Sequence, residues 1–99
     1  MKINKIANPK NESHITYCFW CVACDEVHCI NNQWTFNEDL DNPTFNPSVL
    51  VQGIRNESYF SPRCHLFIQE GKLKYLPDCE HDFRGQTVEM IDVDLWRYR

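Results

Sequence analysis

The chain has 99 residues and a formal net charge of -4. This length predicts one domain, and the acidic balance gives no general attraction to nucleic acid or to an anionic membrane. The sequence contains no apolar run near the roughly 20 residues needed to span a bilayer, and its first residues lack the apolar segment of a signal peptide. We therefore expect a cytoplasmic protein without a membrane or nucleic-acid partner.

Six cysteines are many for so short a chain. In a secreted protein they would suggest disulfides, but cytosolic thiols stay reduced. Metal binding or catalysis is then the better interpretation of the cysteines. A metal would also support a small domain, whose core alone stabilises it only modestly.

The N-terminal third predicts short strands joined by turns. Residues 1–12 are polar and contain Pro9, so we expect a loose lead-in there. β-Branched and aromatic residues predict a strand over 15–20. Two similar runs follow, at 27–30 and 33–36.

The middle of the chain predicts a loop and then a strand. Residues 38–48 contain two prolines, and four acidic or asparagine side chains stand near the start of this segment, which is typical of a loop. The following run, SVLVQGI, predicts a strand that ends near Gly53.

A β-hairpin is the clearest predicted unit, in the sequence CHLFIQEGKLKYLPDC at 64–79. Two alternating runs flank a Glu-Gly pair that is a hairpin turn signal. If Gln69 pairs with Lys72, Cys64 lies on one face of the hairpin, while His65 and Asp78 lie on the other.

The rest of the chain predicts a turn over 80–86 and a closing strand over 87–96. No segment shows a sustained helical period. We predict an all-β or β-rich small domain, 13–99, built of antiparallel hairpins around a zinc knuckle.

Two overlapping Cys-x-x-Cys pairs compete for that knuckle. Bulky aromatic residues fill the space between Cys18 and Cys21, whereas valine and alanine separate Cys21 from Cys24. A knuckle is a tight turn in which two thiolates converge. Cys21 and Cys24 are therefore the predicted ligand pair, and Cys18 and Cys29 are interpreted as apolar strand residues.

Zinc needs two further ligands for a structural site. Cys64 and His81 lie at the two ends of the predicted hairpin and are the first choice. Cys79 can replace His81 in this scheme, and His65 can replace Cys64.

A thiol–disulfide redox site at Cys21 and Cys24 is an alternative, because a tryptophan precedes the pair as in thioredoxin. That chemistry uses a helix N-terminus to lower the thiol pKa. The sequence DEVHCINNQW that follows predicts strand and turn instead.

The whole pattern resembles an uncharacterised family of small phage and prophage proteins, some of which carry the label ammonia monooxygenase without support for it. The resemblance covers residues 17–92. Its matching stretches are Cys21–Cys24 with His28 after it, Trp34–Phe36, Asn42–Ser48, Cys64–Phe67 with Gly71 after it, and Asp78–Val88.

The resemblance implies zinc binding and a phage setting in a bacterial host cell, with no established activity. In that family a proline and a glycine usually stand where this chain has Val22 and Asp25, which implies a less tightly turned knuckle. Serine is a common alternative at position 79, which favours His81 over Cys79 as a ligand.

We therefore expect a zinc-stabilised module that binds a host or phage protein. The alternative is a zinc-dependent hydrolase with an open metal position, for which His28, His65 and Asp78 are the catalytic candidates. Thr44 and Ser48 could line its polar pocket.

Overall fold

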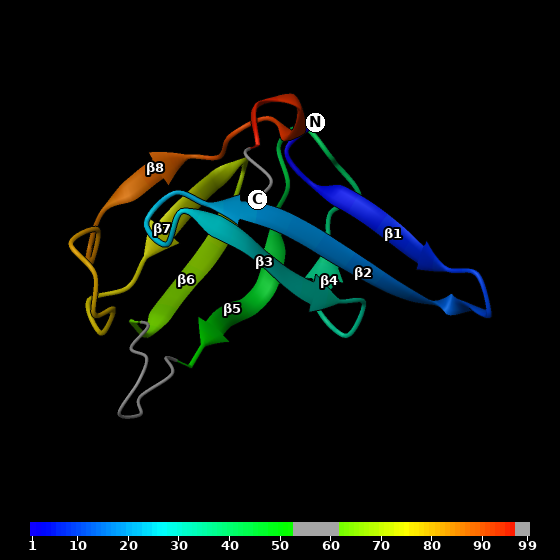
Figure 1. Cartoon of the computed structure of the whole chain (residues 1–99), viewed down its shortest axis with the longest axis horizontal. Coiled ribbons are helices and arrows are strands. Elements are labelled where there is room, and N and C mark those ends of the chain that lie inside the picture. Colours follow the sequence, from blue (N-terminus) through cyan, green and yellow to red (C-terminus); the bar gives the residue numbers. More distant parts are fainter. Residues whose placement is uncertain (53–61, 97–99) are drawn as a thin grey trace.

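The computed structural model describes residues 1–52 and 62–96, in which two antiparallel sheets form two layers (Figure 1). Within these residues there is no α-helix, so the predicted β-rich fold class is confirmed. The elements are β1 (Asn4–Asn8), β2 (Asn11–Cys21), β3 (Glu26–Asn31), β4 (Thr35–Phe36), β5 (Phe45–Val51), β6 (Cys64–Gln69), β7 (Lys72–Tyr75), β8 (Thr87–Glu89) and the 3-10 helix η1 (Val93–Leu95).

The core lies between the two sheets. One sheet has the order β1-β2-β3 and the other has the order β4-β5-β6-β7-β8. Figure 1 shows β2 and β3 crossing over the strands of the larger sheet. Each sheet contributes alternate side chains to one buried cluster, as expected when two apolar sheet faces meet. Its largest fully buried members include Phe19, Phe45, Leu66 and Tyr75.

The hairpin of β6 and β7 has the predicted register. Gln69 pairs with Lys72 across the turn, and Leu66 pairs with Tyr75. Alternate residues of β6, beginning with Cys64, are buried, while His65 between them is only partly covered. The strand alternation therefore separates a core face from an outer face at adjacent residues.

The N-terminal residues differ from the loose lead-in predicted for 1–12. They form β1, which pairs with β2, and Ile3 is fully buried in the core. Pro9 stands in the turn between the two strands, where the Asn8 side chain accepts a hydrogen bond from the Lys10 N–H. The proline thus marks a turn rather than an unstructured segment.

Two predicted boundaries also differ. β5 begins at Phe45, inside the loop predicted for 38–48. The strand predicted over 87–96 ends at Glu89, and the Asp92 side chain instead caps η1 by accepting a hydrogen bond from Asp94 N–H. The predicted strand end at Gly53 lies outside the described residues.

No helix in the described part of the chain has the length and apolar character that crossing a membrane would require.

Phe45 tests the inter-sheet core. It is fully buried, stacks on Phe36 with ring centroids 4.3 Å apart, and meets Tyr17 edge-on. We expect Phe45→Ala to lower the free energy of unfolding by about 3–5 kcal/mol, measured by denaturant titration. Ile6→Thr, on an exposed strand position, should change it by less than about 1 kcal/mol; equal losses would contradict the core described here.

Candidate metal centre and nucleophile site

The turn between β2 and β3 is a tight knuckle. The Asp25 N–H donates to the Cys21 carbonyl at 2.9 Å, and the Cys24 N–H donates to Cys21 Sγ at 3.4 Å. Asp25 has φ 55°, a left-handed conformation that aspartate adopts more readily than most residues. The knuckle therefore closes without a glycine, although the resemblance implied a looser turn.

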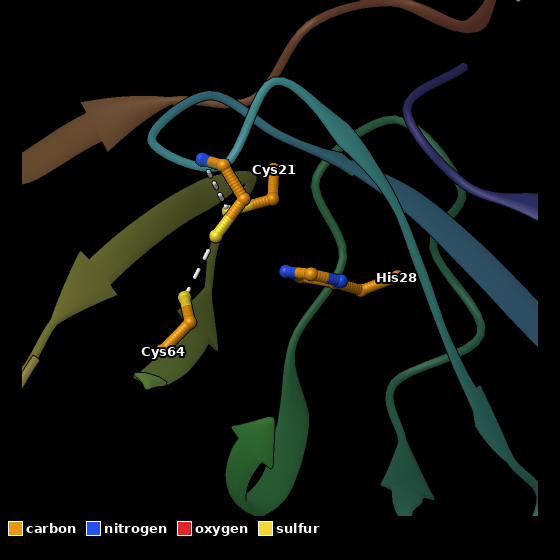
Figure 2. A group of neighbouring side chains, drawn as sticks. Cys21, His28 and Cys64 are labelled. Carbon is orange, nitrogen blue, oxygen red and sulfur yellow. Dashed lines mark hydrogen bonds between the residues drawn. The ribbon is translucent and has the colours of Figure 1, made fainter. Parts of the chain in front are cut away.

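Four metal-ligating side chains converge next to this knuckle. The donor atoms of Cys21, Cys24, His28 and Cys64 all lie within 4.8 Å of one another. They come from the knuckle, from β3 and from the start of β6, so both sheets contribute (Figure 2). Cys21 Sγ is 3.8 Å from Cys64 Sγ. These residues are able to hold a metal ion.

His28 provides an independent reason to place an ion in this cluster. Its side chain is only 7% exposed, and its Nε2 is buried without a hydrogen-bond partner. A buried polar atom without a partner is costly. A neutral imidazole nitrogen facing thiol sulfurs fits a shared cation, which would satisfy it.

His81 lies at the edge of the cluster rather than inside it. Its Nδ1 accepts a hydrogen bond from the Phe83 N–H at 3.2 Å, so the ring proton of the neutral form is on Nε2. That Nε2 lies 3.4 Å from Cys64 Sγ. His81 is thus arranged to donate to the Cys64 sulfur, although Cys64, Cys79 and His81 also form a second group of possible ligands.

The thiols of the cluster share one favoured thiolate, at Cys21. Hydrogen bonds from Cys24 and Cys64 lower the pKa of Cys21. The contact between Cys24 and Cys21 raises the pKa of Cys24 to about 12. The Cys64 pKa is also raised, first by its contact with Cys21. Three thiols this close therefore need a cation before all of them ionise together.

Tyr75 stabilises the Cys21 thiolate from the core. Its hydroxyl accepts a hydrogen bond from the Ala23 N–H at 3.1 Å and lies 3.2 Å from Cys21 Sγ. Burial raises the tyrosine pKa, so the hydroxyl keeps the proton that it donates to sulfur. Tyr75 and His81 therefore supply outer hydrogen bonds of the kind that tune metal ligands.

A second constellation lies on the other face of β6. Ser48 Oγ is 2.9 Å from His65 Nε2, and His65 Nδ1 lies 3.0 and 3.1 Å from the two carboxylate oxygens of Asp78. The side chains of His65 and Asp78 are 24% and 49% exposed, so solvent reaches them. A hydroxyl, an imidazole and a carboxylate in this order form a nucleophile–base–orienting group.

Ser48 occupies an irregular part of β5. The pairing of β5 with β6 shifts register between Phe45 and Val49, and such bulges re-aim side chains. The Trp34 indole N–H donates to the Ser48 carbonyl at 3.4 Å. A pocket of about 240 Å³ is lined by Gln33, Trp34 and Pro47, the last of which precedes Ser48 in the chain.

Comparison with known proteins identifies the family. A family model described as "Bacterial ubiquitination-like system serine protease (BubE)" matches residues 2–76, well over half of the chain. The chain belongs to the BubE family. No curated protein and no solved structure matched the chain in the same comparisons.

The BubE match includes most of both constellations. Its range contains Ser48 and His65 as well as the four clustered metal-ligating residues, and it ends before Asp78. The family's printed description names a serine protease and a bacterial ubiquitination-like system. It contains no phage setting and no metal, so those two expectations stay predictions.

The predicted site residues fall into two groups, the cysteine cluster and the Ser48–His65–Asp78 series. Of the predicted ligands, Cys21, Cys24 and Cys64 lie together, and His81 and the alternate Cys79 lie beside Cys64. Of the catalytic candidates, His65 and Asp78 meet each other, whereas His28 joins the cysteines.

Ser48 was not predicted from the sequence as a candidate nucleophile, although its hydroxyl contacts the His65 ring. The sequence predicted it only as a residue lining a polar pocket, because no motif such as Gly-x-Ser-x-Gly surrounds it. The available signal was weak: a serine beginning one predicted strand, and a histidine near the start of the next.

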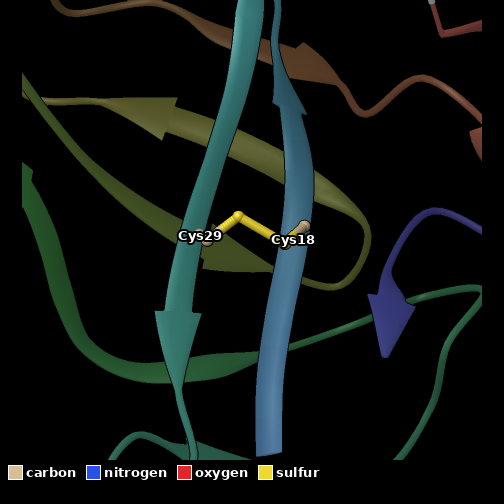
Figure 3. The surroundings of a disulfide bond; sticks show 2 residues. All are labelled: Cys18 and Cys29. Atoms are coloured by element: carbon tan, nitrogen blue, oxygen red, sulfur yellow. A yellow bond between two sulfur atoms is a disulfide. The ribbon is translucent and has the colours of Figure 1, made fainter. Parts of the chain in front are cut away.

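The remaining pair of cysteines is bonded. Cys18 and Cys29 stand directly opposite each other on β2 and β3 and form a disulfide (Figure 3). Both do lie in strands as predicted, but the interpretation of them as unbonded apolar residues is wrong. Direct cross-strand pairing places two side chains close together on one sheet face, and the register that creates this contact was not visible in the sequence.

Thiol counting tests this cysteine arrangement. Alkylation of the denatured protein with chelator but without reductant should modify Cys21, Cys24, Cys64 and Cys79 and spare the bonded pair. Reduction before alkylation should expose all six cysteines. Peptide mass spectrometry measures both results, and six modified cysteines before reduction would contradict the disulfide.

Proposed function

We propose that the protein is a serine hydrolase that cleaves amide bonds in protein substrates of a bacterial ubiquitination-like system. The observation that carries this proposal is the continuous hydrogen-bonded series Ser48–His65–Asp78 on a solvent-accessible face. The family description supports both the serine chemistry and the setting. A protein partner, which the sequence favoured, then enters as the substrate.

The mechanism follows from the three side chains. Ser48 Oγ attacks the carbonyl carbon of the scissile bond, and His65 Nε2 takes the hydroxyl proton. Asp78 holds the protonated imidazole through Nδ1–H. As the C–N bond breaks, His65 returns the proton to the leaving amine, which leaves an acyl group on Ser48. Water, with His65 again as the base, then releases the carboxylic acid.

We further propose that Cys21, Cys24, His28 and Cys64 hold a structural Zn²⁺. Three thiolates and one imidazole are a common tetrahedral zinc donor set. Four protein ligands leave no position open for a zinc-bound water, so this proposal assigns hydrolysis to Ser48 and replaces the zinc-hydrolase alternative. The metal's contribution is folding energy, because its ligands come from both sheets.

The redox alternative has less support. Cys21 is fully buried, and the residues that follow the knuckle form β3 rather than a helix. A thiol that exchanges with other disulfides needs access to them. The lowered pKa of Cys21 is accounted for by its neighbours in the cluster.

A fluorophosphonate probe tests the nucleophile. These reagents phosphonylate serines that an adjacent base activates, so we expect the wild-type protein to be labelled. Ser48→Ala should reduce the labelling rate by at least about 1,000-fold, because the attacking oxygen is absent. Fluorescence of the labelled band, measured over time, gives the rate.

Ser13→Ala is the matched control. Ser13 is exposed and its hydroxyl bonds only to the nearby Asn11 side chain among the contacts described, so labelling should not change. Labelling that survives Ser48→Ala, or a wild-type protein that is never labelled, would contradict the proposed function.

Elemental analysis tests the metal centre. We expect about one zinc per chain, with its loss in His28→Gln, since an amide is a poor replacement for an imidazole ligand. His81→Gln should retain the metal and bind it about 10–100-fold more weakly, as expected for an outer hydrogen-bond donor. Chelation should lower the melting temperature of the wild-type protein.

The exposed His14 provides the control, and His14→Gln should leave zinc content and melting temperature unchanged. Retention of full zinc in His28→Gln together with its loss in His81→Gln would overturn the ligand assignment and favour the set predicted from the sequence.

A further inference from the structure

The turn that follows β7 contacts His65 at both its ring and its backbone. Asp78 in this turn holds the His65 ring through Nδ1. The Leu76 N–H donates to the His65 carbonyl at 2.9 Å. One short segment therefore sets both the rotation of the imidazole and the position of the backbone that carries it.

Cys79 adds a two-way contact to the same backbone. The His65 N–H donates to Cys79 Sγ at 3.2 Å, and the Cys79 thiol donates to the His65 carbonyl at 3.1 Å. Cys79 is 4% exposed, so both hydrogen bonds are shielded from water. A single side chain thus acts as acceptor for the N–H and donor to the C=O of one residue.

The turn itself is anchored to the residue that precedes β6. The Glu80 N–H donates to the Arg63 carbonyl at 3.0 Å, and the Arg63 N–H donates to the Glu80 carboxylate at 2.8 Å. The Arg63 Nε also donates to the Asp78 carbonyl at 3.2 Å. These contacts fix the position of Cys79 relative to β6.

We propose that Cys79 is a positioning residue for the Ser48–His65 pair. Ser48 lies on β5 and His65 on β6, so their 2.9 Å contact depends on where the His65 backbone stands. The thiol fixes that backbone on the core side of β6, while Asp78 fixes the ring on the outer side. This inference rests on the proposed serine hydrolase function.

Inactivation kinetics with the fluorophosphonate probe test the proposal. Cys79→Ala removes both hydrogen bonds, and we expect the maximal inactivation rate to fall between about 10- and 100-fold, with an unchanged half-saturating probe concentration. A hydroxyl also donates and accepts, so Cys79→Ser should restore the rate to within about threefold of wild type. A role in general stability alone does not predict this rescue.

Zinc content and melting curves accompany each variant, because Cys79 lies near Cys64. We expect full zinc content throughout; loss of zinc in Cys79→Ala would identify a ligand and overturn the inference. If Cys79→Ala fails to fold, Cys79→Val fills the thiol's place without its hydrogen bonds and should show the same slow inactivation.

The two proposals fail differently. Wild-type inactivation that does not depend on Ser48 refutes the hydrolase, and the inference with it. If wild-type inactivation requires Ser48 but Cys79→Ala or Cys79→Val is inactivated at the wild-type rate, the positioning role alone is refuted. Failure of Cys79→Ser to recover the rate, in a folded and zinc-loaded variant, also counts against it.

Discussion

The convergence of Cys21 and Cys64 across the two sheets is the constraint on which the rest of the structure depends. Their sulfurs lie 3.8 Å apart in the core, beside the buried and unpartnered Nε2 of His28. A contact of this kind fixes the knuckle against the start of β6. It also requires the Cys64 side chain to point inward, which by strand alternation turns His65 outward.

The proposed chemistry is therefore built on the reverse side of the proposed metal centre. Cys64 on the inner face of β6 contacts Cys21 of the other sheet. The next residue, His65, faces outward and is the proposed base. Ser48 reaches that base from a bulge in β5, and the turn after β7 supplies Asp78 on one side of β6 and Cys79 on the other. Of the three proposed groups, His65 stands on a regular strand, which holds a side chain more precisely than a loop would.

Sequence patterns predicted the parts of this arrangement that depend on alternation. The register of the β6–β7 hairpin follows from two regular runs, and with it the placement of His65 with Asp78 on the face opposite Cys64. Ser48 was predicted only as a residue lining a polar pocket, and its direct contact with His65 was not predicted because a bulge breaks the strand alternation. His28 reaches Cys21 through the register of the β2–β3 hairpin, whereas the meeting of Cys64 with that group depends on how the two sheets pack, which is a tertiary property with no local signal. The strand β1 was missed because its polar sequence is made a strand by its pairing with β2.

The most direct test is a crystal structure of the fluorophosphonate-treated protein, with data collected at the zinc absorption edge. The predicted result is continuous density from Ser48 Oγ to phosphorus beside His65, with one anomalous peak enclosed by Cys21, Cys24, His28 and Cys64. Phosphorus bonded to any other side chain would contradict the assignment of Ser48 as the nucleophile. An anomalous peak coordinated by His81 in place of His28 would contradict the metal centre behind it.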